Sequence, residues 1–292
     1  MRSVCHDWWL SGATKGDHPD MRRNIPLESV SPDLRVMLRG ADWQRVTIGE
    51  SGAEVYRIVA PGQPLRYLKS ASGPRVVELR AERERLSWLA SRLPVPAIHG
   101  WADQTGEGEQ RRAWLLLSEA PGRMACDAAF AHDPRSIVRA LADGLRRMHS
   151  LPLHGCPFDA RLDARLAQAE WMIQNGLTDE AALHERHGFS ATHLLDRLVA
   201  TRPSEPDSDL VFTHGDYCLP NVLLDPAPIE VSGYLDLGRS GIADRYQDLA
   251  IGARSVRYNL GAEWGPRFLD AYDVSALDAE RLMWYETLDE LF

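Results

Sequence analysis

The sequence predicts an α+β fold with a sheet-rich N-terminal lobe, a mainly helical C-terminal lobe and a cleft between them. Residues 42–71 alternate apolar and polar positions around turns that contain Gly and Pro, a pattern typical of antiparallel strands. Beyond the Pro121–Gly122 turn, apolar residues recur at helical spacing. A chain of 292 residues, of which 44% are hydrophobic, is long enough for two such lobes. We expect a loose extension over residues 1–32, an N-terminal lobe over 33–120 and a C-terminal lobe over 121–292.

The N-terminal lobe is expected to contain one long helix, from about Val76 to Ser91. The positions that define its apolar face are spaced 3, 4, 3 and 4 apart: Leu79, Glu82, Leu86, Leu89 and Leu93. Glu82 therefore lies on the buried face, where a carboxylate needs a cationic partner. Residues 111–122 then read as a strand that ends in a turn, which makes a natural lobe boundary.

In the C-terminal lobe, Asp133 and Pro134 are an N-cap and a first-turn proline. The core face of the helix that follows is Ile137, Leu141, Leu145 and Met148. Residues 159–176 form another predicted helix. Short strands are expected within 211–225, and helices close the chain from about Asp244.

The overall charge of −9 argues against nucleic acid or an anionic membrane surface as a partner. The chain has no apolar run of eighteen residues, which a membrane span needs, and its N-terminus lacks the apolar core of a secretory signal. Four scattered cysteines without metal-binding spacing are best explained as free thiols in a reducing cytoplasm. We therefore expect a cytoplasmic protein that is a monomer or a weak homodimer.

The segment HGDYCLPN, residues 214–221, has the spacing of the catalytic loop of protein kinases. Asp216 is followed five residues later by Asn221, and Asp236 precedes a glycine at the end of another predicted strand. Asp216 would reach an acceptor hydroxyl, while Asn221 and Asp236 would give oxygen ligands to Mg²⁺ that bridges nucleotide phosphates. His-Gly-Asp alone would be no more than an Asx-type turn in many proteins. The full combination favours phosphoryl transfer, because a metal phosphatase would need further His and Asn ligands at strand ends, and we find none.

The N-terminal lobe supplies candidates for holding the nucleotide. The turn IGESGAEVY has glycines that let backbone amides and Ser51 approach phosphates. It matches neither the G-x-G-x-x-G motif nor the Walker A motif. Lys69, in a predicted strand, has a candidate partner in the inward-facing Glu82, a pair that in kinases holds the α- and β-phosphates. The alternative for Lys69 is an exposed strand lysine. Tyr67, on the same strand face, would either stack on adenine or pack in the core.

With these residues in view, the chain resembles the aminoglycoside phosphotransferases, specifically the aminoglycoside 3′-phosphotransferases, which share the protein-kinase fold. The resemblance covers about residues 45–292. It is carried by the segments VYRI, YLK, AERERLSWL, LPVP, LLLSEAPG, CPFDARLDARLA, THGDYCLPNVLLD, GYLDLGRSGIADRYQDLA and TLDELF. The last three segments are the most specific, because choline, homoserine and fructosamine kinases share the His-Gly-Asp and Asp-x-Gly logic without that terminus.

The resemblance implies transfer of the γ-phosphoryl group of ATP, with GTP possible, to an aminoglycoside hydroxyl, most often the 3′, and hence antibiotic resistance. It implies Asp216 as catalytic base and Asn221 and Asp236 as Mg²⁺ ligands. The nucleotide positions it implies are Ser51, Tyr67, Lys69, Glu82 and the linker from Ser118 to Ala120. Asp248 would brace the catalytic loop without touching substrate.

The acceptor positions that the resemblance implies are Glu185, Arg239, Arg254, Asp289, Glu290 and the carboxylate of Phe292. From Glu263 to Phe292 the chain has eight Asp or Glu and two Arg. Such a tail is either a solvated surface or an anionic wall for a cationic ligand, and the resemblance favours the wall.

Residues 177–188, LTDEAALHERHG, depart from the family. Ala181, Ala182 and His184 fall where carboxylates are common. Either the enzyme accepts fewer aminoglycosides, or Asp179 and Glu180 compensate. The three histidines of this region, His184, His187 and His193, lack a strong metal motif and are expected to be solvent histidines.

Two alternatives remain open from the sequence. A kinase of another small hydroxyl compound, such as a sugar, an amino alcohol or a macrolide, would keep the nucleotide residues and lose the polycation pocket. A nucleotide-binding pseudokinase would be expected to lack one of four residues: Lys69, Asp216, Asn221 or Asp236. All four are present.

Overall fold

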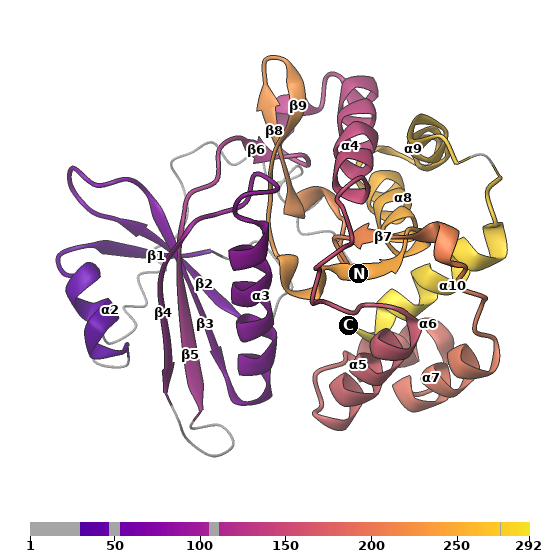
Figure 1. The fold of residues 1–292 in the computed structure, drawn as a ribbon, viewed down its shortest axis with the longest axis horizontal. Coiled ribbons are helices and arrows are strands. Elements are labelled where there is room, and N and C mark those ends of the chain that lie inside the picture. The colour runs from indigo at the N-terminus through magenta and orange to yellow at the C-terminus, as the bar shows by residue number, and fades with distance from the viewer. Residues whose placement is uncertain (1–29, 47–52, 105–110, 275) are drawn as a thin grey trace. The chain divides into compact units, whose positions relative to one another are not determined.

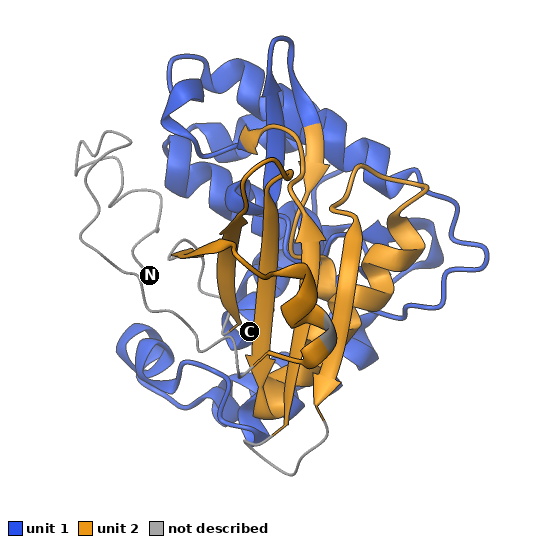
Figure 2. Ribbon diagram, turned by 90° about the vertical axis from the view of Figure 1, so that its left-hand side faces the viewer, with its two compact units in different colours: residues 1, 124–231, 239–292 blue, residues 2–123, 232–238 orange. Residues whose placement is uncertain are grey.

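The computed structural model describes residues 30–46, 53–104, 111–274 and 276–292. These residues form two compact units, shown in different colours in Figure 2. Unit 2 runs to Arg123 and takes in residues 232–238 as well, whereas unit 1 comprises 124–231 and 239–292. The return of 232–238 to the N-terminal unit was not predicted. The expected loose extension lies, except for its last residues, outside the described part of the chain.

Unit 2 is built on a five-stranded antiparallel sheet in the order β1-β2-β3-β5-β4. The strands are β1 Asp42–Val46, β2 Glu54–Val59, β3 Arg66–Ser72, β4 Ile98–Gln104 and β5 Arg112–Ser118. Lys69 lies in the middle of β3, paired with Val55 on one side and Leu115 on the other. The strands expected within 42–71 and 111–122 are confirmed. Strand β4 was missed, because IHGWADQ lacks clear alternation and its pairing is interrupted by a bulge near Gly100.

Helices cover both faces of this sheet, as Figure 1 shows. Helix α2, Pro32–Met37, packs one face through a cluster that includes Leu34, Leu68 and Trp114. Helix α3, Val76–Leu89, contacts β3 and β5, and its buried residues include Glu82. Because β5 lies between these layers, all of its residues from 113 to 117 are buried. The predicted helix and the inward direction of Glu82 are confirmed; α2 was not predicted.

Unit 1 is mainly helical, so the expected α+β class is confirmed. Its helices are α4 Pro134–His149, α5 Leu162–Gln174, α6 Glu180–His187, α7 Ala191–Ala200, α8 Tyr246–Leu260, α9 Trp264–Tyr272 and α10 Ala279–Leu288. The Asp133 side chain accepts a hydrogen bond from the backbone of Ser136, which confirms the predicted N-cap of α4. The predicted apolar face of α4 is buried. Among the described residues no helix is both long and apolar enough to cross a membrane.

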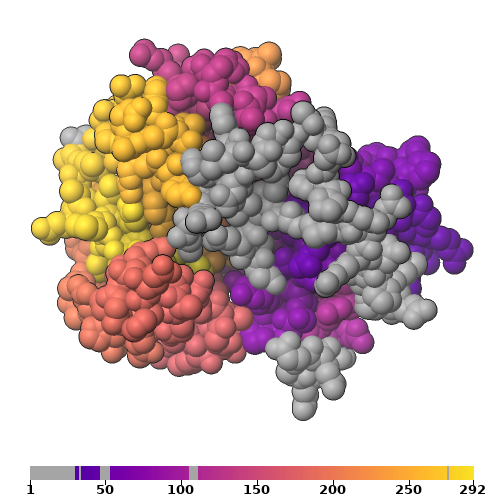
Figure 3. Space-filling model, turned by 180° about the vertical axis from the view of Figure 1, so that it is seen from behind, coloured from indigo at the N-terminus to yellow at the C-terminus, as the bar shows by residue number. Residues whose placement is uncertain are grey.

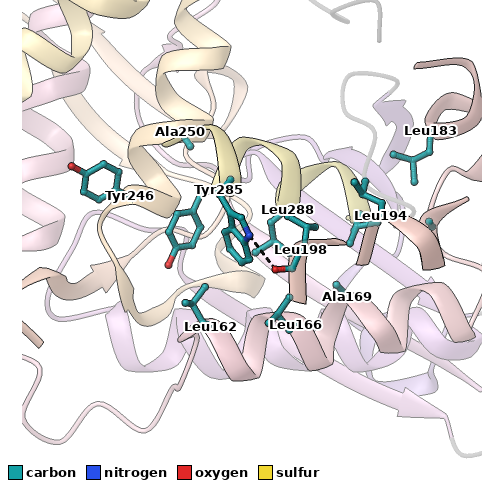
Figure 4. Close-up of a cluster of buried hydrophobic side chains, with 13 residues drawn as sticks. Leu162, Leu166, Ala169, Leu183, Leu194, Leu198, Tyr246, Ala250, Tyr285 and Leu288 are labelled. Carbon is teal, nitrogen blue, oxygen red and sulfur yellow. Dashed lines mark hydrogen bonds between the residues drawn. The ribbon is translucent and has the colours of Figure 1, made fainter. Parts of the chain in front are cut away.

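The core of unit 1 joins α5, α6 and α7 to α8 and α10 (Figure 4). Leu166, Leu198 and Leu288 pack together there, and the Trp284 indole N–H donates to the Leu198 carbonyl at 3.2 Å. Truncating one such leucine to alanine costs roughly 2–5 kcal/mol in a packed core. In the space-filling view of Figure 3, the segment of α5 to α7 (salmon) forms one surface region beside the C-terminal helices (yellow). This core fixes where α6 lies.

Short strands frame the His-Gly-Asp segment. Strand β7, Leu210–Thr213, pairs antiparallel with β10, Gly241–Asp244, and β8, Val222–Pro226, follows the segment. Strand β8 lies between β6, Arg123–Met124, and β9, Ile229–Tyr234, in a three-stranded sheet. The strands expected within 211–225 are therefore confirmed.

Candidate active site

A buried carboxylate holds the His-Gly-Asp loop. The backbone N–H groups of His214 and Gly215 donate to the two oxygens of Asp248 at 2.7 and 2.8 Å. His149 Nε2 lies 3.0 Å from one of these oxygens. Burial alone would raise the pKa of Asp248, but the hydrogen bond and charge of His149, with His214, outweigh it and lower the pKa. The predicted bracing role of Asp248 is confirmed in these contacts.

The middle position of the loop requires glycine. Gly215 has φ +83°, and a Cβ there would collide with the backbone carbonyl of Arg239. Its own carbonyl accepts a 2.8 Å hydrogen bond from the Arg165 guanidinium. The loop therefore has fixed partners on both sides, which holds Asp216 in a defined direction.

Asn221 orients the candidate base directly. Its Nδ2 donates to the Asp216 carboxylate at 2.9 Å and to the Asp216 carbonyl at 3.1 Å. Asn221 is buried, whereas Asp216 is partly exposed. With the amide nitrogen engaged, the amide oxygen accepts no hydrogen bond from the described residues. A neutral oxygen next to a carboxylate fits the hard-oxygen ligand set of Mg²⁺.

In unit 2, Lys69 lies between two carboxylates. Its Nζ donates to Glu82 Oε1 at 2.5 Å and also to the Asp236 carboxylate. Burial alone would lower the pKa of Lys69, but the charges of Asp236 and Glu82 outweigh it and raise the pKa. Burial raises the pKa of Glu82, and Lys69 only partly offsets this. The predicted pairing of Lys69 with Glu82 is confirmed, and Asp236 joins it.

Asp236 has an uncommon backbone. Its φ is +56°, in the left-handed region where non-glycine residues cost free energy. Its side chain is 37% exposed, against 12% for Lys69 and 9% for Glu82. Asp236 is therefore the more exposed of the two carboxylates that share Lys69. An exposed carboxylate oxygen suits a divalent cation as a ligand.

The other predicted nucleotide positions lie along unit 2. Tyr67 is half-buried in β3, two residues before Lys69 and so on the same face. The N–H groups of Ser118 and Glu119 already donate to the carbonyls of Ala97 and Leu65, at 2.9 and 3.2 Å. Within the described chain, Ala120 is then the linker residue whose N–H has no such bond, so it is the better candidate for an adenine edge. Ser51 lies outside the described residues.

The terminal carboxylates of unit 1 are paired with basic side chains of the same unit. Arg254 forms an ion pair with Asp289, and Arg239 lies 3.9 Å from the same carboxylate. Burial would lower the pKa of Arg254, but Asp289 raises it on balance. Glu290 accepts from both Arg186 and His187. The structure thus brings together four predicted acceptor residues: Asp289, Glu290, Arg239 and Arg254.

Two guanidinium groups lie close to the ring of Phe292. Arg165 and Arg239 each lie 4.8 Å from the ring centroid, a cation–π distance. Arg165 is buried, and burial together with the charge of Arg239 lowers its pKa. Arg165 was not predicted, although it shares the buried face of α5 with Leu162, Leu166 and Ala169. A cation on an apolar helical face was the signal that could have found it.

Glu185 lies apart from this group. It is exposed on α6 and makes no ion pair with the described residues. The two carboxylates that could have compensated for missing acidic residues serve as caps instead. Asp179 accepts from the backbone of Ala182, and Glu180 accepts from the backbone of Ala191. No cluster of metal-binding side chains occurs within the described ranges, but His187 is a partner of Glu290 and not simply a solvent histidine.

Comparison with known proteins places this geometry in a family. Residues 42–285 match the model of the phosphotransferase enzyme family. An aminoglycoside 3′-phosphotransferase of Streptomyces fradiae is 38% identical, with 86% of this chain and 95% of that protein covered. The crystal structure of an aminoglycoside-3′-phosphotransferase of type VIII superposes with a TM-score of 0.76 at 38% identity, covering 89% of this chain and 97% of that one. The aminoglycoside phosphotransferase APH(3'')-Id of Streptomyces rimosus, in complex with ADP and streptomycin, gives a TM-score of 0.70 at 32% identity, covering 88% and 95%.

Proposed function

This chain belongs to the phosphotransferase enzyme family, and we propose that it transfers the γ-phosphoryl group of ATP to a hydroxyl of an aminoglycoside, with the 3′-hydroxyl as the first candidate. The resistance that such a reaction confers is part of the proposal. The fold expected for an aminoglycoside phosphotransferase is confirmed by the similarity to the type VIII structure. Similar proteins named for this activity support the substrate class.

The observation that carries the proposal is the pairing of Asp216 with Asn221 on a loop anchored by Asp248. The Asn221 amide fixes one oxygen of the Asp216 carboxylate and leaves the other to accept from an acceptor hydroxyl. A pseudokinase has no need of such a positioned carboxylate. General base or orienting action by a positioned carboxylate contributes roughly 10²–10⁴-fold to rate.

The remaining residues position the nucleotide. Lys69, held by Glu82, would bind the phosphates, and Tyr67 would contact the adenine. Asn221 and Asp236 are the proposed Mg²⁺ ligands, and the ion when bound would neutralise charge on the phosphates. The streptomycin- and ADP-bound relative supports a nucleoside triphosphate as donor. ATP is the proposed donor, GTP is an alternative, and the site of action would be the cytoplasm, where Mg-ATP is abundant.

For the acceptor, Asp289, Glu290 and the carboxylate of Phe292 would receive ammonium groups. Charge-assisted hydrogen bonds from ammonium to carboxylate are stronger than neutral ones and give orientation. Arg239 and Arg254 would hold Asp289 in place, as they do in the structure. Glu185, exposed on α6, would act only if an acceptor extends to that helix.

A second regiochemistry is supported by a specific similarity. A streptomycin 3''-kinase of Streptomyces griseus is 37% identical over most of its length, a value close to that of the 3′ relatives. A 3''-hydroxyl is therefore the second candidate acceptor.

The test is coupled nucleotide turnover with Mg-ATP, using kanamycin and streptomycin as acceptors. We expect turnover with at least one of them. Replacing Asp216 by alanine should abolish turnover while leaving ATP affinity unchanged, measured by calorimetry. Retained turnover in Asp216→Ala would show that Asp216 is not the base. If the wild type binds ATP but turns over neither acceptor, the assignment of aminoglycosides as acceptors is contradicted.

A further inference from the structure

Helix α6 presents two basic side chains to a candidate acceptor carboxylate. Arg186 Nη1 and His187 Nε2 both contact the same oxygen of Glu290, His187 at 2.9 Å. The two positions are adjacent at the C-terminal end of α6 and reach across more than a hundred residues of sequence. Glu290, expected as an open anionic group, is thus occupied by basic side chains of its own unit.

The position of α6 is fixed by packing as well as by charge. Its one buried residue, Leu183, lies beside Leu194 of α7 in the core of unit 1 (Figure 4). Just before the helix, the Thr178 hydroxyl donates to the carbonyl of Leu291 at 2.9 Å. These contacts hold α6 in place and do not involve Arg186. The packing of α6 therefore brings Arg186 and His187 to Glu290.

Exposure distinguishes the two basic partners. The Glu290 side chain is 13% exposed, whereas those of Arg186 and His187 are 35% and 25% exposed. His187 also stacks on Phe189, with ring centroids 5.3 Å apart and planes 20° apart. Among the described residues Arg186 has no second partner, and it is the more exposed of the two, so it is the cation that can leave at small cost. An exposed arginine–carboxylate pair contributes little net stability, which makes exchange feasible.

We propose that Arg186 is a specificity-determining residue: it occupies Glu290 in the free protein and disfavours acceptors that rely on an ammonium at that carboxylate. The inference rests on the proposed function. An incoming ammonium must displace Arg186 or share Glu290 with it, and like charges close together oppose each other. The site therefore favours less highly charged aminoglycosides over more highly charged ones.

The first test compares acceptor KM for the wild type and Arg186→Ala. Kanamycin A and kanamycin B are the acceptors, since kanamycin B has a 2′-amino group in place of the 2′-hydroxyl. We expect KM to fall roughly two- to fivefold in Arg186→Ala, more for kanamycin B, with KM for ATP unchanged. Arg186→Gln, which keeps a donor for Glu290 without the charge, should show most of the same fall. Arg202→Ala, which removes a charge paired with Asp163, is the matched control and should change nothing.

The second test asks whether Arg186 acts through Glu290. In a Glu290→Gln background, Arg186→Ala should no longer lower KM, because the carboxylate that it masks is gone. An equal fall in both backgrounds would overturn the assignment, as would a KM that is unchanged or raised in both Arg186 variants. Loosening of α6 would instead raise KM in Arg186→Ala and lower its melting temperature.

Failure of the proposed function is distinguishable from failure of this inference. If the wild type turns over no aminoglycoside, calorimetric measurement of kanamycin B binding tests whether Arg186 masks Glu290. Tighter binding to Arg186→Ala than to the wild type and Arg202→Ala supports masking of Glu290, and equal or absent binding overturns it. If the wild type is active and the Arg186 variants match it, only the inference fails.

Discussion

The two charged clusters of this protein balance their charges in opposite ways. In unit 2, the single ammonium of Lys69 faces two carboxylates, Glu82 and Asp236. At the terminus of unit 1, Asp289 and Glu290 are met by three arginines and a histidine. In the first cluster two carboxylates share one lysine, whereas in the second the basic side chains outnumber the two carboxylates.

The difference follows from what each cluster is proposed to bind. A divalent cation carries two charges and brings its own phosphate ligands, so at Asp236 it would add a partner and need not replace Lys69. An acceptor ammonium at Glu290 must instead replace an existing partner. When one ionic partner of a carboxylate replaces another, the exchange contributes to selectivity more than to affinity. The comparison predicts that mutations in unit 2 act on the reaction, whereas those at the terminus act on which acceptor is chosen.

Among variants of these two clusters, the largest effect is expected for Lys69→Met. Removing the ammonium takes from the buried Glu82 its ion-pair partner, which costs about 2–4 kcal/mol of unfolding free energy. Losing a donor to the phosphates should also lower kcat/KM by roughly 10²–10³. Urea unfolding and steady-state kinetics measure the two effects. Near-normal turnover in Lys69→Met would contradict the nucleotide assignment.

Asp248→Asn should come next. The native carboxylate accepts two backbone N–H groups and a bond from His149, so an amide loses charge-assisted bonds worth about 2–3 kcal/mol in all. Because the folded pKa of Asp248 is lowered, its stabilisation is full above the unfolded pKa of about 3.9 and is lost as pH falls through the folded pKa. The variant should therefore lose less stability than the wild type between pH ~5 and pH ~2. Parallel unfolding curves across that range would contradict an anchoring carboxylate.

Arg165→Lys should have a smaller effect. Lysine keeps the charge but not the planar fork that bonds the Gly215 carbonyl while lying against the Phe292 ring. We expect a loss of about 1–2 kcal/mol in stability and a fall in kcat with KM for ATP unchanged. A kcat equal to that of the wild type would show that the link between the loop and the terminus does not serve catalysis.

The smallest effect concerns salt. Acceptor KM should rise a few-fold between ionic strengths of about 0.05 M and 0.5 M, because partly exposed ammonium–carboxylate pairs are screened. With increasing ionic strength, the acceptor KM should rise more steeply for kanamycin B than for kanamycin A. An acceptor KM that is insensitive to salt would exclude the carboxylates of the terminus as its binding groups.

Site residues could be predicted from the sequence where a local pattern, such as helical spacing, determines the position of the side chain. Glu82 was predicted on a buried face because its neighbours at helical spacing are leucines, and its side chain is 9% exposed. Arg165 carries the same signal on α5 and was overlooked. The loop residues Asp216 and Asn221 were predicted from their spacing alone, and the hydrogen bond between them agrees with it.

Contacts between distant segments could not be predicted. Arg186 and Glu290 lie 104 positions apart, and no spacing rule links the end of α6 to the terminus. The same holds for Asp236, whose return to unit 2 beside Lys69 depends on how β9 is placed. The acidic tail was therefore predicted from composition. The pairing of Asp289 and Glu290 with basic side chains could be seen only in the three-dimensional fold.

Transfer to the 3′-hydroxyl is tested by turnover of Mg-ATP with kanamycin and with tobramycin, which lacks the 3′-hydroxyl. We expect turnover with kanamycin and none with tobramycin. Turnover of both would keep the substrate class and contradict the 3′ position. Turnover of neither, in a protein that still binds ATP and is equally inactive on streptomycin, would contradict the assignment of aminoglycosides as acceptors.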